Sequence, residues 1–418
     1  MMQAVFRFNH VNWALADQAM VSGVNFLTSV LVARFLGIEE FGLFSLIWVA
    51  VLFFSSFQMS IIVSPMMSIA PKQDDKNLSF YYGSVFIQQL IFSVLSVVSV
   101  VVGVEFGRYF FPEWNIGELL LPLVVVTFFF QLQDFLRRLF FVQGRQVAAF
   151  VNDAISYLMQ LILLIYINTL GLLNTELVLW VIAITSLIAV FIGFIICDKI
   201  NISYDMFIDT AKRHWNVSKW LTGSALLQWL SGNLFIVVAA GLLGVVAIGA
   251  LKAAQSIMGI THILFQGLEN IVPITASHYL HESGKRSMAG YLGKVTIWGG
   301  GATLVLALLV SAFPGHLLMV VFGDEYQDYG YVLRWYALIY LIAFIALPLR
   351  MGLRSMEKTY PLFIAYALMA FFSILSAKWL VQAFGLHGVL IGLLMTGVIF
   401  FATLSFFIKR IYNNYIEN

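Results

Sequence analysis

Long apolar runs of about twenty residues or more recur along the whole chain, the length that a helix needs to cross a bilayer. Hydrophobic residues fill each run and do not alternate with polar ones, which excludes the strands of a membrane barrel. Twelve runs have the length of a span: 13–36, 42–64, 84–106, 118–136, 149–169, 177–197, 219–243, 247–271, 293–313, 331–349, 360–383 and 387–408. The pattern predicts an all-α polytopic membrane protein with about twelve transmembrane helices.

Composition and charge placement agree with this pattern. The chain is 61% hydrophobic and 11% charged, which is too apolar for a soluble domain. If the N-terminus is cytoplasmic, 18 of the 23 lysines and arginines fall on inner loops or at the two termini. This asymmetry predicts that both termini are cytoplasmic, as an even number of spans requires. The net charge of +2 then reflects topology, and nucleic acid is not an expected partner.

Part of the sequence of the first two spans is repeated 207 positions later. The matching pairs are Trp13 and Trp220, Ala33 and Ala240, Leu36 and Leu243, Gly37 and Gly244, and Gly42 and Gly249. A period of half the chain indicates two copies of six spans, which are parallel because six is even. We therefore expect an N-terminal lobe at 1–200, a cytoplasmic linker at 201–218 and a C-terminal lobe at 219–418.

Span eight carries a stripe of polar residues along one face. Steps of 3, 4, 3, 4 and 3 separate its members, which are Lys252, Gln255, Gly259, His262, Gln266 and Glu269. A charged group inside a span costs roughly 2.5–3.5 kcal/mol, so a charge at each end of the stripe favours a water-filled cavity. The alternative is a face that hydrogen-bonds to neighbouring helices without water.

Spans one and seven carry shorter polar stripes. The stripe on span one consists of Gln18, Ser22, Asn25 and Ser29. Asp17 lies beside it, about one turn inside the inner end of the span, where it binds a coupling ion, caps the helix or pairs with an inner-loop arginine. The stripe on span seven consists of Ser224, Gln228 and Ser231. Small polar residues also serve plain helix packing in membranes, so this stripe is less specific.

Other clusters have simpler interpretations. Arg137 and Arg138 belong to the inner-loop group, and Arg138 can form an ion pair with Asp134, four residues before it. His278 and His281 lack a convincing third ligand, so we expect no metal site. The sequence contains no phosphate-binding P-loop. We therefore expect neither an ATPase nor a bound cofactor.

The region around the first two spans resembles a known family. Its motif residues are Asp17-Gln18-Ala19, Ser22-Gly23, Asn25-Phe26, Ala33-Arg34-Phe35-Leu36-Gly37 and Glu40-Phe41-Gly42, and the turn returns at Leu243-Gly244 and Gly249. They are similar to those of bacterial polysaccharide transporters, the O-antigen or lipid-linked oligosaccharide flippases of the multidrug/oligosaccharidyl-lipid/polysaccharide (MOP) exporter superfamily. The resemblance implies a MATE-like fold of two six-helix lobes, with spans 1, 2, 7 and 8 lining a central cavity. Span two departs from this expectation because its matching face is mostly apolar.

The function that the resemblance implies is a flippase. It would move a lipid-linked oligosaccharide or polysaccharide precursor, such as that of lipopolysaccharide O-antigen, across the bacterial inner membrane by alternating access. The substrate cavity would consist of Lys252, Gln255, His262, Gln266, Glu269, Gln18, Ser22, Asn25, Gln228 and Arg34. Asp17 or Glu269 would bind a coupling proton or sodium ion. The expected partners are the lipid-linked glycan, membrane lipid and glycan-assembly enzymes.

The sequence is also compatible with two alternative functions. A multidrug–cation antiporter of the same superfamily would have the same fold, although Lys252 disfavours a cation-binding cleft. A membrane glycosyltransferase or polymerase could use Glu39 and Glu40 as catalytic acids. The repeat places Val245 and Val246 at the equivalent turn, which indicates a structural connector there. Outer loops of about twenty residues also leave no room for a catalytic domain, so the sequence predicts a transporter and not an enzyme.

Overall fold

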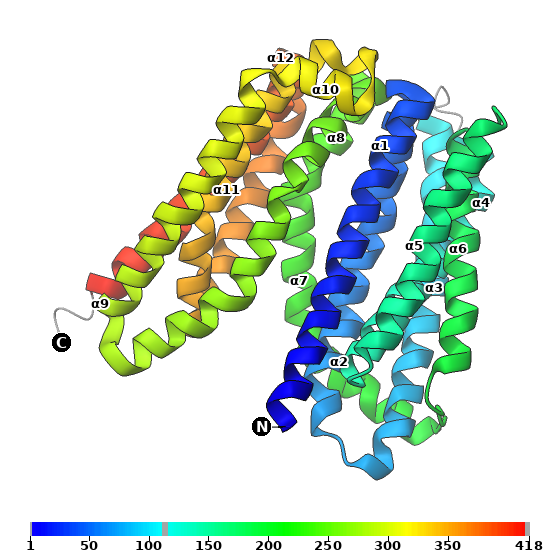
Figure 1. Ribbon diagram of the computed structural model, residues 1–418, viewed down its shortest axis with the longest axis vertical. Coiled ribbons are helices and arrows are strands. Elements are labelled where there is room, and N and C mark those ends of the chain that lie inside the picture. The colour runs from blue at the N-terminus through cyan, green and yellow to red at the C-terminus, as the bar shows by residue number, and fades with distance from the viewer. Residues whose placement is uncertain (1, 111–115, 414–418) are drawn as a thin grey trace. The chain divides into compact units, whose positions relative to one another are not determined.

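The computed structural model describes residues 2–110 and 116–413, except for the side chains of residues 2–11, 75, 262–264, 266–267, 270 and 412–413. In these ranges every regular element is a helix (Figure 1), which confirms the all-α fold. The α-helices are α1 Met2–Gln58, α2 Ser64–Ile69, α3 Asp75–Phe110, α4 Leu120–Val142, α5 Gln146–Thr169, α6 Thr175–Ile196, α7 Tyr204–Leu243, α8 Val245–Gly259, α9 Thr261–Ala312, α10 Pro314–Phe322, α11 Gly330–Ser355 and α12 Tyr360–Asn413. The π-helical turn Met59–Val63 joins α1 to α2.

The number of spans agrees with the sequence pattern. Nine helical stretches among the described residues are long and apolar enough to cross a membrane. Two of them contain two spans each, because α1 bends at Gly37 and α12 bends at Gly385. One more span consists of α8 and the first arm of α9, which bends at Gly284. Divided in this way, the described residues contain the twelve spans that the hydrophobic runs predict.

The sequence repeat is visible in the backbone. Gly37 has φ 80° and ψ 179°, and Gly244, its counterpart 207 residues later, has φ 82° and ψ 177°. Side chains other than that of glycine rarely tolerate this conformation. The same glycine turn therefore bends α1 in the first copy and separates α7 from α8 in the second.

The helices form two compact units. Unit 1 contains Met1–Leu36 and Ile47–Ala225, and unit 2 contains Gly37–Leu46 and Leu226–Asn418. The boundary between the units therefore falls inside α7, which is helical from Tyr204 onward. The bend of α1 and the first part of its second arm, residues 37–46, belong to unit 2 by their contacts, whereas the first arm and the rest of the second arm belong to unit 1.

Each unit is built around one central helix. In unit 1, α4 packs against α3, α5 and α6, and it contributes the buried side chains of Phe135, Leu136 and Phe140 to the core. In unit 2, α11 packs against α8, α9, α10 and α12, with Phe344 fully buried. These two helices are the fourth and tenth spans, which are equivalent positions in the two copies. The duplication has therefore kept the internal arrangement of each unit.

Candidate functional site

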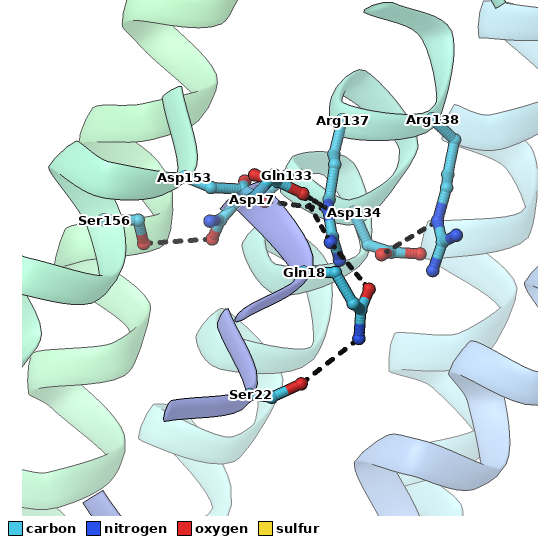
Figure 2. A network of polar contacts seen from close by, with 9 residues as sticks. All are labelled: Asp17, Gln18, Ser22, Gln133, Asp134, Arg137, Arg138, Asp153 and Ser156. Atoms are coloured by element: carbon cyan, nitrogen blue, oxygen red, sulfur yellow. Dashed lines mark hydrogen bonds and ion pairs between the residues drawn. The ribbon is translucent and has the colours of Figure 1, made fainter. Parts of the chain in front are cut away.

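A buried ionic cluster lies in unit 1, where three helices meet. Arg137 of α4 lies between Asp17 of α1 and Asp153 of α5 (Figure 2). Arg137 Nη2 is 2.6 Å from Asp17 Oδ2, and Arg137 Nε is 2.8 Å from Asp153 Oδ2. Both aspartates are 0% exposed and Arg137 is 7% exposed. A guanidinium at this depth requires acidic partners, because an unpaired charge inside a span is costly.

Polar side chains around the cluster connect it to the stripe on span one. Gln18 Oε1 accepts a hydrogen bond from Arg137 Nη2 at 3.3 Å, and Gln18 Nε2 donates to Ser22 Oγ at 3.2 Å. On the other side, Ser156 Oγ of α5 donates to Gln133 Oε1 of α4 at 3.1 Å. Figure 2 shows this chain of contacts, which crosses from α1 through α4 to α5. The polar stripe of span one is therefore part of a network that the ion pairs organise.

The charges of this cluster do not balance. Two carboxylates face one guanidinium, so the fully ionised cluster carries one negative charge. Asp17 Oδ1 is also buried without a hydrogen-bond partner among the described residues. Uncompensated buried charge and unpaired polar atoms are both costly. A proton or a small monovalent cation bound here would remove the excess charge.

The sequence predicts the ion pairs of this region only in part. The pairing of Arg138 with Asp134 is confirmed, with Nε 3.4 Å from Oδ1. Asp17 does have an arginine partner, but the assignment of Arg137 to an inner loop was wrong. Arg137 lies within α4 and is buried in unit 1 because it is paired with two carboxylates. Asp153 was missed, although a lone carboxylate inside the apolar run 149–169 is a signal that could have revealed it.

The stripe of span eight is divided between two helices. Lys252, Gln255 and Gly259 lie on α8, which ends at Gly259, whereas Glu269 lies on α9, which begins at Thr261. The side chains of His262 and Gln266 are outside the described residues. Ile260, the single residue between the two helices, has φ -57° and ψ -33°, so the backbone stays in the helical region where they meet.

The two charged ends of this stripe have different partners. Lys252 Nζ donates to Gln255 Oε1 at 3.0 Å, and no carboxylate forms an ion pair with it in the described part of the chain. Glu269, in contrast, forms an ion pair with Arg350 of α11. Lys252 is therefore a half-buried positive charge held by a neutral amide, while the charge of Glu269 is compensated within unit 2.

The remaining predicted cavity residues lie on exposed surfaces of their helices. Asn25 and Arg34 are exposed on α1, and Gln228 is exposed on α7. The backbone carbonyls of Asn25 and Gln228 accept hydrogen bonds from Ser29 and Ser231, three or four residues later. The amide side chains of Asn25 and Gln228 are thus accessible to a polar ligand.

Comparison with known proteins places this architecture in one class of membrane protein. The fold is that of the MATE and lipid-flippase transporters: the lipid II flippase MurJ in an inward closed conformation aligns with a TM-score of 0.72 at 15% identity, covering 96% of this chain and 87% of that one. An inward-facing multidrug resistance MATE family transporter of the MOP superfamily aligns with a TM-score of 0.71 at 14% identity, covering 95% of both chains.

A third solved structure and a family model also match this chain. A MOP superfamily transporter from Pyrococcus furiosus, described as having a binding pocket of reverse polarity, aligns with a TM-score of 0.63 at 13% identity over 95% of this chain and 93% of that one. The MatE family model matches residues 221–379. No curated protein matches the chain in sequence. At these identities the structural likeness establishes the fold.

Proposed function

We propose that this chain is a transporter of the MOP superfamily that moves a lipid-linked oligosaccharide or polysaccharide precursor across the bacterial inner membrane. The MatE match and the fold shared with MurJ and MATE proteins support the transporter class. The observation that carries the substrate class is Lys252, a positive charge inside the membrane region whose described partner is the neutral Gln255. An anionic head group such as a diphosphate would supply the missing counter-charge.

The buried carboxylates support the same choice of substrate. Asp17 and Asp153 are both engaged by Arg137, so unit 1 does not present them as a free pair for an organic cation. Lys252 adds a positive charge in unit 2. A substrate with an anionic head and many hydroxyl groups fits these charges and the exposed amides of Asn25 and Gln228 better than a cationic drug does.

In the proposed transport cycle, the head group passes through a polar cavity while the lipid tail stays in the bilayer. The proposed cavity residues are Arg34 and nine residues drawn from the three stripes: Lys252, Gln255, His262, Gln266, Glu269, Gln18, Ser22, Asn25 and Gln228. A proton or sodium ion would couple to the cycle at Asp17, where one negative charge is in excess. Coupling at Glu269 would break its one ion pair with Arg350, whereas the cluster of Asp17, Arg137 and Asp153 can bind one proton or cation and keep a balanced ion pair, which makes Asp17 the preferred site.

The proposed function can be tested in a strain from which the gene has been deleted. We expect surface glycan to be lost and its lipid-linked precursor to accumulate inside the cell. Wild-type protein should restore export, whereas Lys252→Ala should reduce it by roughly tenfold to a hundredfold, as for the loss of a charged hydrogen bond. Lys378→Ala, which removes an exposed lysine of α12, is the matched control and should export normally.

The same experiment separates the alternatives. Export at the wild-type level by correctly inserted Lys252→Ala protein would refute the role of Lys252. A multidrug–cation antiporter remains the second candidate, because the MATE transporter aligns almost as well as MurJ does. In that case the deletion would raise sensitivity to cationic dyes and leave surface glycan intact. A change in polymer length without trapped precursor would favour a glycosyltransferase or polymerase.

A further inference from the structure

The helix α7 is much longer than a bilayer requires. Its 40 residues, Tyr204–Leu243, extend about 60 Å at 1.5 Å per residue, against about 30 Å for the hydrocarbon core. The apolar part of the helix is the run 219–243. The first fifteen residues, 204–218, therefore form an extension beyond the apolar run, and this extension belongs to unit 1.

One face of the extension is fixed against unit 1. Thr210, His214 and Ser218, at steps of four, are buried. His214 Nε2 is 2.9 Å from the hydroxyl oxygen of Tyr81 on α3. Just before the helix, Asn201 Nδ2 donates to Ser79 Oγ at 3.1 Å. These contacts hold the extension in one rotational orientation, so its opposite face must point away from unit 1.

The contact with Tyr81 also sets the depth of the extension. Tyr81 lies about one helical turn before the apolar run 84–106 of α3, at the level where a span leaves the hydrocarbon core. His214 lies at the same level because its ring contacts the Tyr81 side chain. Residues within a turn or so of His214 are therefore placed at the depth of lipid head groups.

The face opposite His214 combines basic and aromatic side chains. Lys212, Trp215 and Lys219 follow one another at steps of 3 and 4, and all three are exposed, Trp215 by 59%. Neither lysine forms an ion pair in the part of the chain that the structure describes. Asp205 and Asp209 are also exposed and continue the same face toward the start of the helix, about two turns and one turn before Lys212, so they lie farther from the apolar run than the two lysines do. Indole rings prefer the membrane interface, and lysines beside them reach phosphate groups.

We propose that Lys212, Trp215 and Lys219 form a docking surface for anionic phospholipid head groups of the leaflet at this end of unit 1. The two ammonium groups bind lipid phosphates on either side of the Trp215 ring, which inserts at the interface. A basic residue near an anionic membrane surface contributes about 1 kcal/mol, or about fivefold in local lipid concentration. The surface is independent of the substrate route, so its experimental test is independent of the test of the proposed function.

Fluorescence quenching of Trp215 tests this proposal on the whole protein. The protein is reconstituted with brominated phosphatidylglycerol or brominated phosphatidylcholine at equal mole fraction, and the Trp215 signal is the difference between wild type and Trp215→Phe. We expect the anionic lipid to quench this signal at least about fivefold more effectively at low salt, the effect of one lysine, and the preference to fall as salt rises. Lys212→Gln/Lys219→Gln should abolish the preference.

A matched control removes the same charge elsewhere. Arg286 and Lys294 are exposed residues of α9 in unit 2, and Arg286→Gln/Lys294→Gln should leave the preference of Trp215 unchanged. Equal quenching by the two lipids in wild type would overturn the proposal, as would an equal loss of preference in the control. Absence of quenching by either lipid would place this face off the bilayer and also refute it. If the Lys212/Lys219 variant does not fold, the wild-type comparison at low and high salt still decides.

Discussion

At the scale of single residues, Arg137 shows how a charged side chain is accommodated inside a span. Its guanidinium is bound by Asp17, 120 residues away in the sequence, and by Asp153. The favourable free energy of the two ion pairs has to offset the loss of hydration of the guanidinium and both carboxylates. Removing the arginine leaves two carboxylates uncompensated in a buried environment, whereas removing one acid leaves a balanced pair.

This imbalance leads to a first prediction. Arg137→Gln should lower the free energy of unfolding by about 3–5 kcal/mol, the cost of breaking a buried ion pair. Arg137→Gln/Asp153→Asn should recover part of this loss because one of the two uncompensated buried carboxylates is removed. Thermal unfolding of the purified protein measures both effects.

The neighbouring arginine provides the control for this prediction. Arg138 also pairs with an aspartate, Asp134, but the two side chains are 30% and 21% exposed. Arg138→Gln should cost no more than about 1 kcal/mol, as for other ion pairs that reach solvent. Equal destabilisation by Arg137→Gln and Arg138→Gln would show that burial does not distinguish the two pairs.

Cys197, the only cysteine, supplies a second prediction at this scale. Burial, with a smaller contribution from the carboxylate of Asp198, raises the pKa of the Cys197 thiol. A raised pKa leaves less thiolate at neutral pH, so labelling by maleimide should be slow there and accelerate as the pH rises. The labelling rate of the native protein, compared with that of the protein in denaturant, measures this. Equal rates at neutral pH would contradict the expected protection.

At the scale of elements, the two glycine turns pack against each other within unit 2. A Cβ atom at Gly42 would collide with the backbone carbonyl of Val245, and one at Gly249 would collide with that of Ile38. Ile38 and Val245 are equivalent positions of the repeat, as are Gly42 and Gly249, so the contact is reciprocal. Each glycine lets the backbone of the other turn approach closely.

One contact at these turns breaks the symmetry. Glu325 Oε2 accepts a hydrogen bond from the backbone N–H of Ile38 at 2.8 Å. This bond satisfies an amide group at the start of the second arm of α1, where a helix has no internal acceptor. Phe41 of the same segment stacks on Phe322 and contacts Tyr326 edge-on. The segment 37–46 is therefore held in unit 2 by polar as well as aromatic contacts.

The reciprocal contact predicts how substitutions at these glycines behave. Gly42→Val should lower the free energy of unfolding by about 1–3 kcal/mol, because the backbones must separate to admit the side chain. Gly23→Val on the first arm of α1 is the control, since no atom lies within 4 Å of its Cβ position. Its effect should stay within about 0.5 kcal/mol. Similar unfolding temperatures for both variants would contradict the close packing of the turns.

At the scale of the whole molecule, span parity determines which connections share a side of the membrane. The connection 170–174 between α5 and α6 and the connection 197–203 between α6 and α7 lie on opposite sides of α6. The distribution of basic residues predicts that 197–203 is cytoplasmic. The protein is therefore expected to expose one of these connections to each compartment.

Single cysteines test this topology. In a Cys197→Ser background, Leu172→Cys should react with an impermeant thiol reagent added to intact cells, whereas Ile202→Cys should react only after the membrane is opened. Leu172 and Ile202 are 60% and 67% exposed, so accessibility within the protein does not separate them. The reverse labelling pattern would show that the orientation predicted from charge is wrong.

The sequence alone determined the features that depend on local patterns. The length of the apolar runs fixed twelve helical spans, because an unpaired backbone is not tolerated in lipid. The 207-residue repeat located the turns at Gly37 and Gly244, since a backbone with this φ and ψ requires glycine. The pairing of Arg138 with Asp134 followed from their i,i+4 spacing on one helix.

Only the tertiary structure decided which distant charges meet. From the sequence, Arg137 is expected to be one of several basic residues on inner loops. In the structure it is buried, because the packing of α1 and α5 against α4 brings Asp17 and Asp153 into contact with it. The stripe of span eight could not reveal that Glu269 pairs with Arg350 of α11. Helical periodicity reports which residues share a face, whereas a buried ion pair depends on which helices pack together. That packing brings together residues far apart in sequence, and no local pattern records it.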